Sequence, residues 1–302
     1  MAIIEVNGLT KSYGNRVVLD GVSFSVEEGE VFGILGSNGA GKTTTVECVE
    51  GLRKPDSGRI SVLGLDPRED GRALREMVGV QLQQTQLPPN LKVEEALDLY
   101  ASFYRAPRDW RELLEEWGLA ELRGMRFGKL SGGQKQRLFI AIALVGDPKV
   151  AFLDELTTGL DPQARRGTWE LVKQVRARGV TTVLVSHFMD EVEELCDRVA
   201  VIDGGTVVAL DTPAGLVGSA AGDSRMRFSV PAGTEDPTAL LRGLPGVVGV
   251  QREGDRFTVT GAGDFVTAVT ACLARHRIIA ADLRIDRRTL EDAFIALTSR
   301  NR

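Results

Sequence analysis

A glycine-rich segment that ends in a lysine carries the clearest chemical signal in this sequence. Gly36, Gly41, Lys42 and Thr43 meet the pattern G-x-x-x-x-G-K-[ST], after an apolar run at 31–35 and before a helix-forming segment. Glycines let backbone N–H groups surround a phosphate, and a helix start favours negative charge. The lysine and the hydroxyl suit phosphate oxygens and Mg²⁺. The segment predicts a nucleotide site, and the alternative is an ordinary glycine-rich turn between a strand and a helix.

Two adjacent carboxylates close another apolar run. Residues 149–155 read Lys-Val-Ala-Phe-Leu-Asp-Glu, so a predicted buried strand ends in Asp154 and Glu155. An unpaired charge is costly to bury, and such a pair therefore needs a reason. Asp154 could bind Mg²⁺ directly or through water, and Glu155 could orient or deprotonate an attacking water. The alternative is a pair of solvated carboxylates at the end of a strand.

Two further segments offer groups that bind phosphate. The segment Ser131–Gln134 reads Ser-Gly-Gly-Gln and opens a predicted helix with a serine N-cap, so its free N–H groups could meet an anion. Taken alone, such a segment is more often a flexible turn. A strand predicted at 181–185 ends at His187, which could hydrogen-bond a γ-phosphate and water. A histidine in this position is usually only a polar cap.

The elements around these motifs indicate an α/β fold. Short antiparallel strands are predicted at 3–6 and 17–26, and the helix after the glycine loop is predicted from Lys42 to about Leu52. Strands follow at 59–63 and 78–82. Apolar residues then adopt helical spacing, which predicts a helical insertion at about 88–148.

Composition disfavours several classes of protein. The 302 residues include 37 Lys and Arg against 42 Asp and Glu, so the net charge of -5 provides no bulk attraction for nucleic acid or anionic lipid. Cys48, Cys196 and Cys272 are widely separated, which favours a reducing compartment without disulfides or zinc sites. Neither a signal peptide nor an apolar run long enough to span a bilayer is evident. We therefore expect that any membrane role requires another polypeptide.

In this order, the motifs resemble the ATP-binding subunit of ABC transporters over roughly residues 1–217. The resemblance implies a P-loop ATPase that uses ATP and Mg²⁺. It implies catalytic roles for Glu155, His187 and Gln83, with a one-residue alternative at Gln84, and metal ligation by Thr43, Gln83 and Asp154. The nucleotide-binding residues that it implies are Tyr13, Ser37, Asn38, Gly39, Ala40, Gly41, Lys42, Thr43, Thr44, Ser131, Gly132, Gly133, Gln134 and Asp161.

The same resemblance implies partners. Two copies would meet head to tail in the ATP-bound state, with each Ser131 helix closing on the ATP held by the Lys42 loop of the other chain. The expected membrane partner is a separate integral permease, which contacts the chain near residues 83–91 and holds it at the cytoplasmic face of the cell membrane. Ser37 and Leu156 replace prolines that are common in this family, and neither change removes a functional group.

The segment after Pro213 predicts an accessory domain at 223–302. Its order of strand, helix, strand, strand, helix, strand is the split βαβ, ferredoxin-like pattern. A final helix with one apolar stripe at Leu290, Ala293, Phe294 and Leu297 is predicted, and its segment Leu290-Glu291-Asp292-Ala293-Phe294 resembles the tails of drug- and antibiotic-resistance exporters. The domain could act as a stabilising lid or bind a regulator or partner. Efflux of a drug-like or other small substrate is the favoured function, and the alternatives are a soluble ATPase with a non-membrane partner and a nucleotide sensor.

Overall fold

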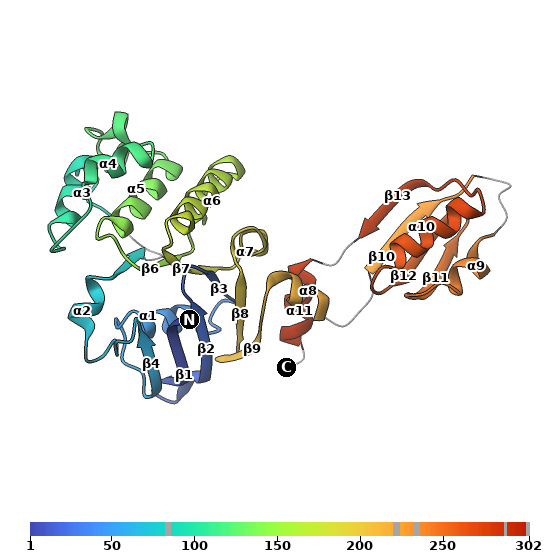
Figure 1. Cartoon of the computed structure of the whole chain (residues 1–302), viewed down its shortest axis with the longest axis horizontal. Coiled ribbons are helices and arrows are strands. Elements are labelled where there is room, and N and C mark those ends of the chain that lie inside the picture. Colours follow the sequence, from blue (N-terminus) through green and yellow to red (C-terminus); the bar gives the residue numbers. More distant parts are fainter. Residues whose placement is uncertain (82–85, 220–223, 232–235, 287–288, 300–302) are drawn as a thin grey trace. The chain divides into compact units, whose positions relative to one another are not determined.

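The computed structural model describes residues 1–81, 86–219, 224–231, 236–286 and 289–299 (Figure 1). The chain divides into two compact units. The first comprises Met1–Leu216 together with the C-terminal residues from Leu297, and the second is Val217–Ala296. The assignment of an ATP-binding domain to 1–217 and an accessory domain to 223–302 stays a prediction about function.

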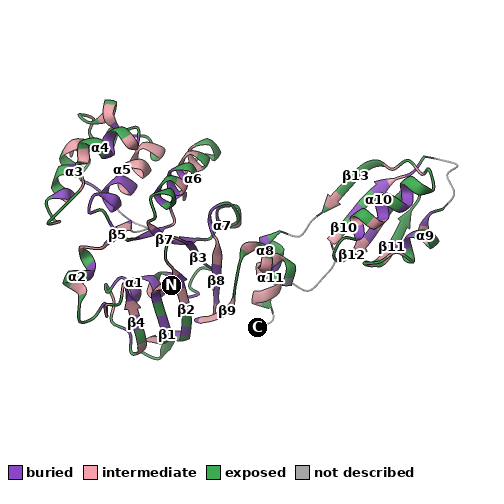
Figure 2. Ribbon diagram, viewed as in Figure 1, coloured by how far each residue is buried: buried purple, intermediate pink, exposed green. Residues whose placement is uncertain are grey.

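A six-stranded sheet forms the centre of the first unit. Its strand order is β5-β6-β7-β3-β8-β9, and all neighbours are parallel except β8 and β9. The strands are β3 (Val31–Gly36), β5 (Val78–Gln81), β6 (Val150–Asp154), β7 (Thr181–Ser186), β8 (Arg198–Asp203) and β9 (Thr206–Asp211). Every residue of β3, β6 and β7 is buried, as expected for parallel strands covered on both faces (Figure 2). The carboxyl ends of these three neighbours therefore meet at one edge of the sheet.

A smaller antiparallel sheet supports the glycine loop. It has the order β2-β1-β4 and consists of β1 (Ala2–Tyr13), β2 (Arg16–Glu27) and β4 (Ser57–Val62). The first two strands are longer than predicted and are joined by the two-residue turn Gly14-Asn15, where Gly14 has a φ of 58°. Helix α1 (Lys42–Val49) packs between the sheets. It ends earlier than the predicted Leu52, because Glu50 caps the helix and Gly51 turns with a φ of 75°.

The expected helical insertion is present in the first unit. It contains α3 (Val93–Ala101), α4 (Trp110–Glu116) and α5 (Gly132–Leu144), with 3₁₀ turns at Ala120–Leu122 and Phe127–Lys129. Trp117 is only 1 % exposed and lies in its core. Four helices were not predicted from the sequence: α2 (Gly71–Arg75), α6 (Pro162–Ala177), α7 (Met189–Leu195) and α8 (Pro213–Ser219).

The second unit has the predicted ferredoxin-like order. Its four antiparallel strands follow the spatial order β11-β12-β10-β13, and its core contains Phe228, Phe257 and Phe265. The elements are β10 (Ser224–Ser229), α9 (Thr238–Arg242), β11 (Val247–Glu253), β12 (Arg256–Gly261), α10 (Phe265–Arg275) and β13 (Ala281–Asp286), followed by α11 (Leu290–Ser299). These bounds agree with the predicted segments to within a few residues.

Two general properties bear on function. Among the described residues, no helix combines the length and the apolar character needed to span a bilayer. The three cysteines are buried and free.

Candidate functional site

The glycine loop runs from the end of β3 to the start of α1, and two of its glycines are required by packing. A Cβ on Gly36 would lie 2.3 Å from the backbone oxygen of Ile202 in β8. Gly41 has a φ of 106°, and a Cβ there would lie 2.6 Å from the Leu19 side chain in β2. The loop therefore passes closer to its neighbouring strands than any other residue type would permit.

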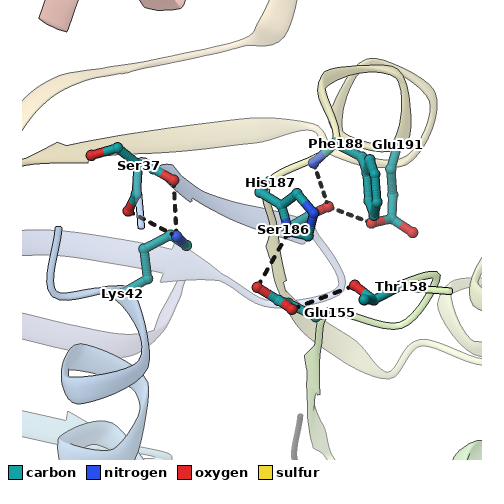
Figure 3. A network of polar contacts seen from close by, with 9 residues as sticks. Ser37, Lys42, Glu155, Thr158, Ser186, His187, Phe188 and Glu191 are labelled. Carbon is teal, nitrogen blue, oxygen red and sulfur yellow. Dashed lines mark hydrogen bonds and ion pairs between the residues drawn. The ribbon is translucent and has the colours of Figure 1, made fainter. Parts of the chain in front are cut away.

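Lys42 places a buried ammonium inside this loop. Its Nζ donates hydrogen bonds to the Gly36 oxygen at 2.8 Å and to the Ser37 oxygen at 3.1 Å (Figure 3). The residue is 6 % exposed, so burial lowers the pKa of the ammonium, while the charges of Glu155 and Asp154 act in the opposite direction. A polyphosphate in the loop would meet this charge at close range.

The other loop residues differ in their access to solvent. Ser37, Asn38 and Gly39 are exposed, and Ala40 is buried. In the first turn of α1, Thr43 is exposed and Thr44 is partly so. The backbone of the loop tip and the Thr43 hydroxyl are therefore open to a ligand.

Asp154 ends β6 with an unsatisfied oxygen. The residue is 7 % exposed, and its Oδ1 is buried without a hydrogen-bond partner among the described residues. Burial, together with the charge of Glu155, raises the pKa of this carboxyl to about 6, although Lys42 opposes the shift. A buried carboxylate oxygen without a donor fits a hard divalent cation. The described residues hold no cluster of three or more His, Cys, Asp or Glu side chains suited to a metal.

Glu155 and His187 face each other from neighbouring strands (Figure 3). His187 Nδ1 lies 3.2 Å from Glu155 Oε1, and the Thr158 hydroxyl donates to Glu155 Oε2 at 3.4 Å. Glu155 has a φ of 49°, in the left-handed region that costs a side-chain-bearing residue about 1 kcal/mol. Its backbone N–H bonds the Val185 oxygen at 2.9 Å and holds this turn. Strain retained at the end of a buried strand is typical of a functional residue.

Two predicted residues of the nucleotide site, Tyr13 and Gln83, have no described contact with the cluster around Lys42. Tyr13 is 42 % exposed at the end of β1, where the Arg53 guanidinium lies 5.3 Å and the Lys11 ammonium 5.7 Å from the centre of its ring. The predicted residue Gln83 lies outside the described residues.

The Ser131–Gln134 segment forms a second helix start in another part of the first unit. Ser131 and Gln134 form a capping box, in which the Ser131 N–H bonds Gln134 Oε1 at 2.9 Å. The two intervening glycines, Gly132 and Gly133, lie against the start of α6, where Asp161 Oδ1 accepts two backbone N–H bonds at 2.9 Å. Figure 1 shows α5 among α3, α4 and α6, whereas α1 lies beside the smaller sheet. Lys42, Asp154, Glu155 and His187 thus form one cluster, and Ser131 belongs to a different surface.

A cavity of about 590 Å³, which was not predicted from the sequence, lies between the core and the helical insertion. Tyr100, Phe103 and Tyr104 line it from the insertion, and Glu50 lines it from the core. Glu50 is 7 % exposed, and its Oε2 has no partner among the described residues. Burial, and secondarily the charge of Asp154, raises the pKa of Glu50 to about 8. One signal was available in the sequence: Glu50 follows the apolar Val46 by four residues, which places it on the buried face of α1.

The buried Glu50 carboxyl predicts a pH-dependent stability. Folding raises the pKa of the Glu50 carboxyl. The stability that the protonated carboxyl contributes is therefore fully present below pH 4.5 and is lost as the pH rises through about 8. Replacing Glu50 with Gln is therefore expected to stabilise the protein relative to wild type at pH 9, by on the order of 4 kcal/mol, and much less at pH 5. Urea unfolding at several pH values measures this difference. Glu76→Gln, on a one-third-exposed carboxyl of the same cavity, serves as the control. A Glu50→Gln advantage that does not change with pH would contradict the placement of this carboxyl.

Comparison with known sequences finds relatives along the whole chain. A sequence profile of the ABC transporter family matches residues 19–158. The Nod factor export ATP-binding protein I of Paraburkholderia xenovorans is 40 % identical over 99 % of this chain and 98 % of its own length. The linearmycin resistance ATP-binding protein LnrL of Bacillus subtilis is 34 % identical over 99 % of both chains. The daunorubicin resistance ATP-binding protein DrrA3 of Streptomyces coeruleorubidus is 35 % identical over 99 % of this chain and 96 % of its own.

Solved structures match about 70 % of the chain. CbiO1 from Clostridium perfringens, part of the transporter complex cbiONQ, aligns with a TM-score of 0.66 and 32 % identity, covering 72 % of this chain and 91 % of its own. A dimeric ATP-binding cassette in a post-hydrolysis state with ADP and Pi aligns with a TM-score of 0.61 and 28 % identity, covering 69 % of this chain and 98 % of its own.

Proposed function

This chain belongs to the ABC transporter family of ATP-binding proteins and hydrolyses ATP to power export, and we propose that it does so as two copies joined to a separate membrane permease. The observation that carries the ATPase activity is the cluster of Lys42, Asp154, Glu155 and His187 at one edge of the sheet. The proposed cargo is a drug-like or other small molecule, because relatives over nearly the full length are named for Nod factor export and for linearmycin and daunorubicin resistance.

In the proposed reaction, each member of the cluster has a separate task. Lys42 and the loop N–H groups bind the β- and γ-phosphates. Glu155 orients the attacking water and takes its proton, and His187 holds Glu155 and contacts the γ-phosphate. Thr43 and Asp154, with Gln83 from outside the described residues, would hold Mg²⁺, which when bound neutralises phosphate charge. Tyr13 would stack on the adenine.

A second copy is proposed because one chain keeps its two phosphate-binding helix starts apart. The capped start at Ser131–Gln134 belongs to the helical insertion and packs on α6, away from α1. In the head-to-tail arrangement, this segment of one copy closes on the ATP held by the Lys42 loop of the other. The similarity to a dimeric cassette solved with ADP and Pi supports the presence of two copies.

The proposed permease contact is the cavity between the core and the helical insertion. Residues 83–85 of the predicted contact region 83–91 lie outside the described residues; of the others, Leu87 is only 6 % exposed, whereas 86 and 88–90 are exposed. The cavity adds an exposed aromatic surface, because Phe103 is 64 % exposed beside Tyr100, with the two rings 5.6 Å apart in an edge-to-face pair. An apolar permease helix seated there would place this chain at the cytoplasmic face of the cell membrane.

Phe103→Asp is expected to abolish binding of the permease without lowering the ATPase activity. The charge would lie in the apolar contact but on the exposed side of the protein, so ATP turnover without the permease should stay within about twofold of wild type. Co-purification of a polytopic membrane protein with the tagged chain, from detergent-solubilised membranes of the cell that encodes it, measures the contact.

Leu99→Asp is the matched control, since Leu99 is 46 % exposed on α3, shortly before the turn that holds Phe103, and does not line the cavity. Loss of the membrane protein in Phe103→Asp, with retention in Leu99→Asp, is the expected result. Recovery of only non-membrane partners by the wild-type chain would instead favour the alternative ATPase that acts outside the membrane.

A further inference from the structure

Glu191 is a fully buried carboxylate to which the proposed reaction gives no task. It lies on α7, and its residue is 0 % exposed. Burial raises the pKa of this carboxyl, while hydrogen bonds to it and the charge of Arg165 act against the shift. A buried carboxylate is costly unless donors satisfy its oxygens, so its retention indicates that its bonds hold something in place.

One oxygen of Glu191 holds the turn that carries His187 (Figure 3). The Ser186 hydroxyl, at the end of β7, donates to Glu191 Oε2 at 2.5 Å and accepts the Phe188 N–H at 3.1 Å. These two bonds fix the residues on either side of His187. The position of the imidazole beside Glu155 therefore depends on Glu191.

The other oxygen of Glu191 meets α6. Trp169 Nε1 donates to Glu191 Oε1 at 3.3 Å. Two further pairs join α6 to α7, Arg165 with Asp190 at 3.1 Å and Lys173 with Glu194 at 2.5 Å. Residues 165, 169 and 173 share one face of α6, because they are spaced by four. Of the three pairs, Trp169–Glu191 is the one whose carboxylate also bonds the Ser186 hydroxyl.

The start of α6 contacts the second phosphate-binding segment. A Cβ on Gly132 would lie 3.2 Å from the Leu160 side chain, and one on Gly133 would lie 3.3 Å from the Ala164 side chain. These glycines therefore pack directly on the residues that begin α6. A shift of the Ser131–Gln134 segment must displace α6 or break this packing.

We propose that Glu191 is a positioning residue that couples the Ser131–Gln134 segment to His187 through α6 and Trp169. The inference rests on the proposed two-copy site. In that arrangement, the segment contacts the ATP of the partner copy, while His187 serves the ATP of its own chain. The buried link therefore joins the two ATP sites of the dimer, so that closure at one site sets the imidazole at the other.

Trp169→Phe tests this link, because it keeps an aromatic ring and removes the N–H donor, and the volume lost with the indole belongs to a partly exposed side chain. The expected result is a fall of about tenfold in kcat, with KM for ATP and the melting temperature close to wild type. Ser186→Ala is expected to lower kcat similarly, and the double variant to be no slower than the slower single variant, because both changes act through Glu191. Lys173→Met is the control: it removes a neighbouring pair whose members are more than 40 % exposed, and it should leave kcat unchanged.

Two results would overturn the inference. One is a wild-type kcat in Trp169→Phe, and the other is a double variant in which the two losses multiply as independent effects do. Failure of the proposed function is a separate outcome: a wild-type chain that never associates in ATP would refute the two-copy site, whatever Trp169→Phe does to kcat.

Discussion

Glu155→Gln is expected to lower ATP turnover by about a thousandfold while leaving ATP binding intact. Glu155 is the carboxylate that the structure holds against His187, at 3.2 Å, in a strained turn at the end of β6. The amide keeps the shape and can still hydrogen-bond, but it cannot accept a proton from water, and general-base catalysis supplies about a hundredfold to ten-thousandfold in rate. Phosphate release at saturating ATP and Mg²⁺ measures turnover, and calorimetric titration of ATP measures binding.

Glu5→Gln is the matched control for this variant. Glu5 is an exposed carboxylate on β1, so ATP turnover in Glu5→Gln should equal that of the wild type. A Glu155→Gln protein that keeps more than about a tenth of the wild-type rate would remove Glu155 from the proposed role, because the loss would then fall below that of a general base.

Lys42→Met is expected to abolish useful ATP binding as well as turnover. The ammonium lies within the loop, on the oxygens of Gly36 and Ser37, where phosphates would meet it. Loss of one such charged donor in a buried site costs about a hundredfold to a thousandfold in rate. Met retains most of the aliphatic length, so the main structural cost is two carbonyls without a donor, about 1 kcal/mol each. Titration with ATP and phosphate release measure the two effects.

Lys149→Met separates this effect from a general loss of positive charge. Lys149 is exposed and precedes β6, at the opposite edge of the sheet from Asp154. ATP affinity should be unchanged in this control. An unaltered affinity in Lys42→Met would show that the loop does not bind the nucleotide.

The sequence predicted the local parts of the site well, because their signals are contiguous. The glycine loop, the strand ending in Asp154 and the serine-capped helix start each combine a residue pattern with its own flanking element. The structure confirms these elements at β3 and α1, at β6 and at α5. The elements of the second unit were predicted equally well, since its strands alternate apolar and polar residues and glycines mark its turns. Helix α1 was predicted too long, because the left-handed turn at Gly51 was overlooked.

The partners of buried charges could not be predicted. The spacing from Val46 indicates only that Glu50 lies on the buried face of α1, and Glu191 looks like an ordinary helix carboxylate in the sequence. The fold is needed to show that the first lines a cavity and the second joins two helices. Strand order likewise depends on pairing between distant segments, so the adjacency of β6, β7 and β3 was not available beforehand. The unassigned α6 and α7 contain the residues that link the two parts of the proposed site.

The molar mass of the Glu155→Gln protein in solution, with and without ATP and Mg²⁺, tests the central claim most directly. If two copies close around ATP, light scattering should show one 32.7 kDa chain without nucleotide and twice that mass with it. Adding Ser131→Arg to the same protein should restore the single-chain mass while the Lys42 loop still binds ATP. A Glu155→Gln protein that binds ATP yet keeps the single-chain mass at every concentration would contradict the two-copy motor.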